Sequence, residues 1–400
     1  SKPPLIIKMP NKLKPKQRIF SPTFYKVLTT AITIPLLYAA SWIGCNIAYE
    51  SLPPNHTGKR IVDQQRIYYE NLGLEKGRYA NLTFNGERIT NEHGHRTQES
   101  YPAINNNPLE YRILFIGGSK TWGDGVEAGE ACPAQVGEML SKEFPQYTIR
   151  SMNDGKCGFA SEALLDYYRK YQRKLNPDLV IIYTGVNNAS NPLYPLAGDP
   201  IVKIKEIPSR KEVDLLNNPY IGPIVCLYKA WKLNRESDAA KIGKEIRRVM
   251  SEDEEVKKAL ARARVHNQGL HDNLEAIVKD LKARDIKVLL IPEERNPYEK
   301  GREDYEKNMI RVHTIAVRNN KEVIEDVAEK QGVHYIEINP LSIPEKEWLD
   351  FCHLTAEGCS IEARIIADYI IQQGFIPQEM SRREADQNKT LTQVHEEAQQ

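Results

Sequence analysis

The sequence predicts an α/β fold: a three-layer α/β/α sandwich with a mainly parallel sheet, preceded by one N-terminal transmembrane helix. Two observations lead to this prediction. Apolar runs of strand length recur along the chain and are separated by stretches of helical periodicity. Upstream of them, residues 27–48 carry no charge, and this length is sufficient to cross a bilayer core of about 30 Å.

The N-terminal elements predict the orientation of the chain. Residues 1–26 form a basic arm that contains several lysines and arginines and no acidic residue. Positive charge favours the cytoplasmic side, so we expect a single-pass protein with a cytoplasmic N-terminus and a periplasmic or extracytoplasmic main domain. Residues 27–48 would contact the lipid bilayer. A cleaved signal peptide is the alternative, although its apolar region is usually shorter.

Residues 49–109 are predicted to form a linker and cap, because turn signals such as Pro53-Pro54 and Asn85-Gly86 interrupt them. This segment contains the run Ile89-Thr-Asn91-Glu-His-Gly94-His-Arg96. Its two histidines, His93 and His95, could bind a metal, but a turn is the favoured interpretation. We therefore predict neither a metal nor a cofactor.

The main domain is predicted at residues 110–375, with strands at 112–116, 146–151, 178–184, 286–291 and 333–337 and helices between them. Right-handed crossovers would make the sheet flavodoxin-like. About a hundred residues separate the third and fourth strands, more than one crossover needs, so residues 191–262 are predicted to be an insertion. The charged part of this region, 238–264, has a helical pattern.

Two features of the chain leave alternatives open. The aromatic residues of the insertion could line an acyl or sugar pocket, although packing of the insertion itself is favoured; they are Tyr194, Tyr220, Tyr228 and Trp231. Residues 376–400 form a polar tail whose composition is typical of disorder. Subunits of a larger membrane complex could hold this tail and the basic arm.

A serine stands where a nucleophile is expected. The buried run Ile113–Ile116 is followed by Gly117-Gly118 and then by Ser119, at the carboxyl end of the first predicted strand. Open α/β sheets bind their ligands at this edge. Three further blocks follow a predicted strand or begin a predicted helix. They are Asn153-Asp-Gly155-Lys-Cys-Gly158, Gly185-Val-Asn187-Asn188 and Asp350-Phe-Cys-His353-Leu-Thr-Ala-Glu-Gly358.

In this order the four blocks resemble the SGNH (GDSL-like) serine hydrolase family over roughly residues 110–373, as a membrane-anchored member. The run 89–96 resembles an Asn-x-x-Gly-x-Arg element found before the serine block in anchored members. The resemblance implies an oxyanion hole made by the backbone N–H groups of Ser119 and Gly155 and by the side-chain amide of Asn187.

The chemistry of the site follows from the residue types. A serine hydroxyl needs a base to take its proton, and His353 is the candidate base for Ser119. A carboxylate fixes the tautomer of such a histidine, and Asp350 lies three residues before it. The predicted catalytic residues are therefore Ser119, Asp350 and His353. They would act through an acyl-serine intermediate on an oxygen ester, as an esterase or an O-acyltransferase.

Three positions depart from the family pattern: Gly118 replaces an aspartate, Asn188 replaces an aspartate, and Lys120 replaces a small or apolar residue. These departures keep open the alternative of a non-catalytic subunit of a membrane complex, with the same fold and a vestigial site. None of them removes a residue that transfers a proton or donates to an oxyanion.

Composition limits the partners. The formal net charge is +1, which argues against nucleic-acid binding, since that function needs a marked basic excess. We expect an ester-bearing small molecule, glycan or lipid as the substrate. Six cysteines without a Cys-x-x-Cys motif predict no redox centre. Cys157 and Cys352 lie in blocks that should converge, so the sequence allows either a disulfide or two free thiols.

Overall fold

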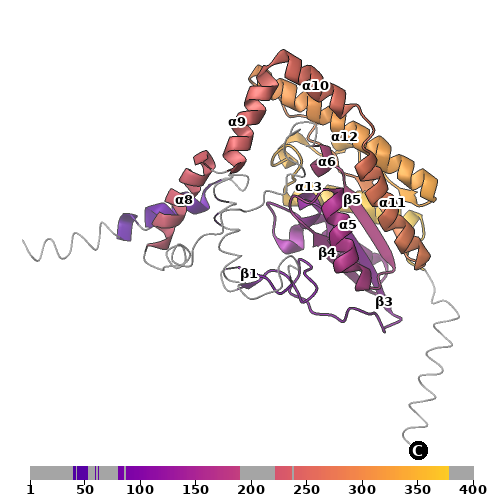
Figure 1. Ribbon diagram of the computed structural model, residues 1–400. Helices are drawn as coiled ribbons and strands as arrows, with labels where there is room; N and C mark the ends of the chain where they lie inside the picture. Colours follow the sequence, from indigo (N-terminus) through magenta and orange to yellow (C-terminus); the bar gives the residue numbers. More distant parts are fainter. Residues whose placement is uncertain are drawn as a thin grey trace, which may run out of the picture.

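The computed structural model describes residues 39–41, 43–52, 59, 62, 80–84, 87–189, 221–236 and 238–377. At its centre lies a five-stranded sheet with the strand order β4-β3-β5-β6-β7, in which every neighbouring pair is parallel (Figure 1). The strands are β3 (Glu110–Gly117), β4 (Thr148–Gly155), β5 (Leu179–Thr184), β6 (Lys287–Pro292) and β7 (His334–Tyr335). The predicted strands are all present, and their order is the flavodoxin-like one.

Side chains of β3, which lies between β4 and β5, alternate between two apolar cores. Ile113 and Phe115 of β3 pack into one core, whereas Leu114 and Ile116 pack into the other. Successive side chains of a strand point to opposite faces, so a strand covered on both sides is apolar throughout. This explains why the run before Ser119 contains no polar residue.

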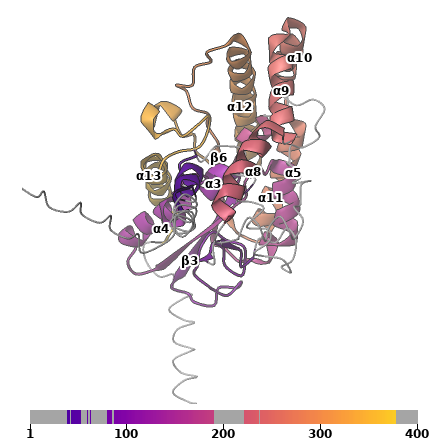
Figure 2. The same cartoon turned by 90° about the vertical axis from the view of Figure 1, so that its left-hand side faces the viewer.

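Helices cover both faces of the sheet. Figure 2 shows α4 (Cys132–Glu143) and α13 (Ala356–Gln372) on one side of the sheet, with α5 (Ser161–Lys170) and α11 (Gln268–Ala283) on the other. The long helix α12 (Asp304–Gln331) joins the second layer through its buried valines and isoleucine. The prediction of an α/β fold with a parallel sheet is confirmed.

Strand β4 extends further than the sequence indicates. The prediction ended it at residue 151, where apolar residues give way to Asn153 and Asp154. In the structure the strand continues to Gly155, which pairs with Gly117. The polar side chains are satisfied inside the fold, because Asp154 forms a buried ion pair with Lys156 and accepts from Gln172 Nε2 at 2.7 Å.

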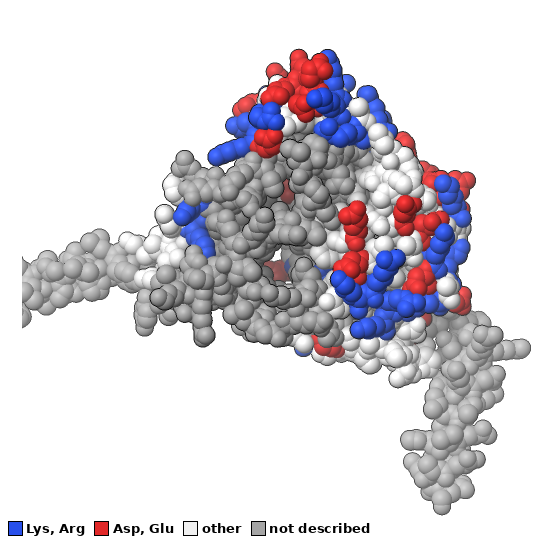
Figure 3. Space-filling view, viewed as in Figure 1, with Lys and Arg blue, Asp and Glu red and all other residues white. Residues whose placement is uncertain are grey.

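Several helices lie between β5 and α11 in the described part of the chain. They are α6 (Val186–Ala189), α8 (Gly222–Glu236), α9 (Asp238–Ser251) and α10 (Asp253–Ala263). Helices α9 and α10 pack on α12, as predicted for a helical region, through residues such as Val249, Leu260 and Val312. Acidic and basic side chains are interspersed over these helices in Figure 3, and several form ion pairs three or four residues apart.

The aromatic residues of the insertion divide into two groups. Tyr194 and Tyr220 lie outside the described residues. Tyr228 and Trp231 lie on α8, where they are 61% and 55% exposed, so for these two the expected burial within the insertion is wrong. Their ring centroids are 6.3 Å apart, and each side chain remains largely open to solvent.

The N-terminal region is described only in part. Residues 43–50 are helical, and Tyr49 packs against Cys226 and Ala230 of α8. Within the ranges described above, the structure contains no helix whose length and apolar character would let it span a membrane. The basic arm, residues 27–38 of the predicted membrane segment and residues 378–400 of the tail lie outside these ranges. A short hairpin of β1 (Thr83–Phe84) and β2 (Glu87–Arg88) lies within residues 49–109, the predicted linker and cap.

Candidate active site

A tight turn carries Ser119 from the sheet into a short helix. Strand β3 ends at Gly117, and Ser119 is the first residue of α3 (Ser119–Trp122). A Cβ atom at Gly117 would lie 2.1 Å from Tyr183 O and 2.0 Å from Thr121 Oγ1. Only glycine lets the end of β3 approach β5 this closely, so the glycine before the turn fixes where the serine emerges.

A hydrogen-bonded chain joins the three predicted catalytic side chains. Ser119 Oγ lies 2.8 Å from His353 Nε2, and His353 Nδ1 lies 2.8 Å from Asp350 Oδ2. The other carboxylate oxygen, Asp350 Oδ1, accepts the backbone N–H groups of Cys352 and His353 at 2.9 and 2.8 Å. Asp350 is therefore fixed by its own loop before it orients the imidazole.

Electrostatics of the site favour a charged imidazole. Burial alone would lower the pKa of His353, but the adjoining Cys352 sulfur and the Asp350 carboxylate outweigh burial and raise it above the ordinary value of 6.5. Burial likewise opposes the ionised form of Asp350, yet its hydrogen bonds with His353 lower its pKa to about 2. The carboxylate thus stabilises the imidazolium that forms when histidine accepts a proton.

The same loop brings together three potential metal ligands. One donor atom each of Asp350, Cys352 and His353 lie within 4.8 Å of one another. Both imidazole nitrogens, however, are within hydrogen-bond distance of Asp350 and Ser119. The arrangement fits proton transfer along this chain better than metal coordination. All six cysteines are free thiols, and Cys157 is exposed whereas Cys352 is buried, so the disulfide allowed by the sequence is not formed.

Asn187 lies beside the serine turn. It belongs to α6, which begins at the end of β5, and its Nδ2 donates to Phe159 O at 2.9 Å. A Cβ atom at Gly118 would lie 2.6 Å from this Nδ2. The missing side chain at position 118 therefore leaves room for the amide of Asn187.

Gly155 does not offer a free donor, which corrects the prediction that its N–H contributes to an oxyanion hole. Its N–H donates to Asn153 Oδ1 at 3.1 Å. A Cβ atom there would lie 2.2 Å from Trp122 N, so this glycine is required for packing of β4 against α3. Among the residues that the structure describes, the N–H of Gly158 has no hydrogen-bond partner. Gly158 has a φ of +78° and directly precedes Phe159, the residue that Asn187 contacts.

Asn188 and Lys120, the two other positions that depart from the family pattern, both make structural contacts. Asn188 accepts the Ser161 N–H at 3.0 Å and donates to Ser161 Oγ at 3.0 Å, so it ties α6 to the start of α5. Lys120 points into the core, where its Nζ lies 2.6 Å from Glu362 Oε1 of α13. Tyr183 Oη donates to the same oxygen at 2.8 Å. Asn188 and Lys120 therefore both stabilise the helices and strands around Ser119.

One residue beside the site was missed by the sequence analysis. Glu293 follows β6 and is 2% exposed; its Oε2 accepts the Val186 N–H at 3.0 Å, and its Oε1 lies 3.4 Å from the Cβ position at Gly118. Burial raises its pKa to about 7, despite the Val186 N–H and the charge of Lys120. Its position at the carboxyl end of a parallel strand was the available signal.

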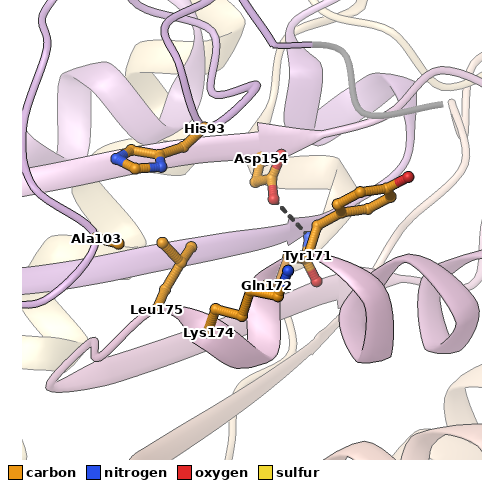
Figure 4. A pocket seen from close by; sticks show the side chains of 7 residues that line it. All are labelled: His93, Ala103, Asp154, Tyr171, Gln172, Lys174 and Leu175. Carbon is orange, nitrogen blue, oxygen red and sulfur yellow. Dashed lines mark hydrogen bonds between the residues drawn. The ribbon is translucent and has the colours of Figure 1, made fainter. Parts of the chain in front are cut away.

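A separate cavity lies along β4, under the segment that contains the two histidines (Figure 4). Its volume is about 180 Å³, and none of the predicted catalytic side chains lines it. His93 and His95 lie in a turn, as favoured by the sequence, because the N–H groups of both donate to Asn91 Oδ1. The lining residues are His93, Ala103, Asp154, Tyr171, Gln172, Lys174 and Leu175.

Comparison with known families adds independent evidence. The sequence profile of the GDSL-like lipase/acylhydrolase family matches residues 115–361, which is more than half of the chain. The chain belongs to the GDSL-like lipase/acylhydrolase family. It is thus an enzyme of the ester hydrolase class, and the resemblance to the SGNH (GDSL-like) family seen in the four sequence blocks is confirmed. Comparison with curated proteins finds no match.

Several solved structures are similar to this GDSL-like chain. A catalytic mutant of Axe2, an acetylxylan esterase from Geobacillus stearothermophilus, has 15% identity and a TM-score of 0.38, with 67% of this chain and 97% of that chain covered. LAE5, an α/β hydrolase enzyme from the metagenome of Lake Arreo, Spain, has 14% identity and a TM-score of 0.35, with 64% and 94% covered. At such identities and scores the likeness says nothing of the substrate.

Proposed function

We propose that this chain is a membrane-anchored serine hydrolase of oxygen esters that acts through an acyl-Ser119 intermediate. His353 removes the proton of Ser119 as the serine oxygen attacks the ester carbonyl, and then returns it to the leaving alcohol. Water regenerates the enzyme in an esterase, whereas a sugar or lipid hydroxyl does so in an O-acyltransferase. Asn187 and backbone N–H groups of Ser119 and Gly158 would stabilise the oxyanion.

The observation that carries this proposal is the hydrogen-bonded chain from Ser119 through His353 to Asp350, with both contacts at 2.8 Å. A vestigial site in a non-catalytic subunit has no need to keep this geometry, so the chain of contacts favours the enzyme. The contact between Ser119 and His353 joins residues 234 positions apart, so a chance approach of two loop side chains is a poor explanation.

A serine-directed fluorophosphonate probe tests the nucleophile directly. We expect the purified protein to be labelled at Ser119, because His353 activates only that hydroxyl. Ser119→Ala should abolish labelling, whereas Ser161→Ala, which removes a hydroxyl bound by Asn188, should retain it. A folded wild-type protein that remains unlabelled would support the non-catalytic alternative. Adding an acceptor alcohol to an ester substrate then separates transfer from hydrolysis by the product formed.

The membrane part of the proposal is supported by the sequence. The uncharged run 27–48 follows the basic arm 1–26, and an inserted helix resists the salt that screens electrostatic contact. We expect the protein to stay in membranes through high-salt washes, with the arm protected from protease added outside. Release of the full chain by salt would contradict the anchor. Native sizing in mild detergent tests for other membrane subunits, since a single detergent-bound copy would exclude them.

The pH dependence of activity should report His353. Because its pKa lies above 6.5 and the neutral form is the base, log(kcat/KM) should fall as the pH drops, with a midpoint above 6.5. Asp350→Asn should lower that midpoint, since it removes a charge that favours the imidazolium. Initial rates measured from acid to alkaline pH give both midpoints. A rate that stays flat well below pH 6 would exclude histidine as the base.

Variants at Asn187 and at two neighbouring positions test the role of the Asn187 side-chain amide. Asn187→Ala should lower kcat by about a hundredfold or more, with a small change in KM, because the amide is needed only as charge develops. Gly118→Ala should resemble it, since the added Cβ displaces Asn187 Nδ2. Asn188→Ala should mainly lower the melting temperature, because Asn188 binds Ser161. Equal losses of kcat at positions 187 and 188 would mean that this block only braces a loop.

A further inference from the structure

The Asn91–Arg96 element has a defined internal structure. Asn91 is its centre, because Oδ1 accepts the N–H groups of His93 and His95 at 3.0 and 3.1 Å, and Nδ2 donates to Glu99 O at 3.1 Å. Gly94 turns the chain with a φ of +84°, which favours glycine. The turn therefore presents residue 96 in a fixed direction.

This turn is attached to the edge strand of the sheet. The N–H of Arg96 donates to Asn153 O at 2.8 Å. Lys156 Nζ, buried beside Asp154, donates to Gly94 O at 3.1 Å. The backbone of Arg96 is thus tied to β4, which pairs directly with the strand that leads to Ser119.

From this backbone position beside β4, the Arg96 side chain extends to the loop after α3. Its Nη1 donates to Trp122 O at 2.6 Å and to Gly123 O at 2.8 Å, and its Nη2 donates to Val126 O at 2.5 Å. Its guanidinium also lies over the Trp122 ring, 5.1 Å from the centroid. One half-buried side chain therefore binds three carbonyls of a single loop.

The loop of residues 122–126 contains two glycines with positive φ and lies next to Ser119 and His353. Gly123 and Gly125 both have positive φ, 84° and 97°, so their backbone has alternatives that other residues lack. The N–H groups of Gly123 and Asp124 donate to Ser119 O at 2.9 and 3.0 Å. Asp124 Oδ2 lies 4.0 Å from His353 Nε2. A shift of the loop would therefore move the serine relative to its base.

We propose that Arg96 is a positioning residue that holds the turn carrying Ser119 in register with His353 by binding the carbonyls of residues 122, 123 and 126. This inference rests on the proposed serine-hydrolase function. The three parts of the Asn-x-x-Gly-x-Arg pattern then have separate tasks: Asn91 builds the turn, Gly94 reverses the chain, and Arg96 binds the loop. Arginine suits this task because its planar guanidinium offers several donors in a fixed geometry, whereas lysine offers a single ammonium.

The test compares Arg96→Lys with Arg150→Lys. Arg150 lies on β4 and binds Glu110 and Glu99, so its variant disturbs a neighbouring half-buried ion-pair network without touching the loop. We expect Arg96→Lys to lower kcat by about a hundredfold, as a displacement of about 1 Å can, with KM changed by less than about threefold. Arg150→Lys should keep the wild-type kcat. Guanidinium ion at low concentration should restore part of the kcat of Arg96→Ala.

Two results would overturn the positioning role: a wild-type kcat in Arg96→Lys, or an equal loss of kcat in Arg150→Lys at matched thermal stability. Hydrogen exchange separates this inference from the proposed function. Amides of residues 122–126 should exchange faster in Arg96→Lys than in the wild type, whether or not an ester is turned over. Unchanged exchange in Arg96→Lys would contradict the positioning role of Arg96. Faster exchange in Arg96→Lys, together with a wild type that is neither labelled nor active, would contradict only the serine-hydrolase function.

Discussion

Replacing His353 with alanine should lower kcat by on the order of 10⁴- to 10⁶-fold, because it removes the base 2.8 Å from Ser119 Oγ. Ser119→Ala should cause a loss of similar size. Residues that act as one unit are not additive, so the double variant should be no slower than either single variant. Ester turnover measured at high enzyme concentration gives these rates.

The control for this prediction is folding. His353 is 7% exposed and lies on a loop, so circular dichroism and thermal unfolding should show that each variant keeps the fold. Losses that multiply in the double variant would mean that the two residues act independently. That outcome would contradict proton transfer between them, even if each single variant were slow.

The second large effect concerns the stability of the core below the nucleophile. Lys120 and Glu362 are 5% and 1% exposed, and their ion pair is 2.6 Å long. Lys120→Met should lower the free energy of unfolding by about 3–5 kcal/mol, because it leaves the Glu362 carboxylate buried without its cation. Urea unfolding followed by fluorescence measures this change.

Two further variants serve as controls for the predicted loss of stability in Lys120→Met. Lys120→Met combined with Glu362→Leu should recover most of the lost stability, since an apolar pair replaces the charges. Lys142→Met should have little effect, because Lys142 and Glu138 form an exposed pair that water screens. A double variant as unstable as the single one would mean that packing, and not the unpaired charge, sets the loss.

The sheet could be predicted because buried strands have a strong sequence signal. Residues 113–116 and 179–182 are apolar throughout, as expected for strands covered on both faces. The end of β4 could not be predicted, since Asn153 and Asp154 look like loop residues until their partners are known. Those partners, Trp122, Lys156 and Gln172, come from three different segments.

The candidate site shows the same limit. Ser119, His353 and Asp350 were found because their spacing and order carry a chemical meaning. The assignment of Gly155 as a donor was wrong because a glycine needed for packing and a glycine that offers a free N–H look alike in a sequence. Arg96 was noted only as part of the 89–96 run and Glu293 was missed, because their contacts with backbone atoms of distant segments appear only in the folded chain. The predicted membrane segment stays a prediction.

The position of His353 also has a consequence for synthesis of the chain. Ser119 and its proposed base are 234 residues apart, and between them the chain adds four of the five strands of the central sheet. A ribosome therefore completes the nucleophile long before it supplies the base. Any nascent or truncated chain that ends before residue 350 contains an ordinary, unreactive serine hydroxyl. On the proposed mechanism, Ser119 becomes reactive only in a complete and folded molecule, so an emerging chain does not hydrolyse esters.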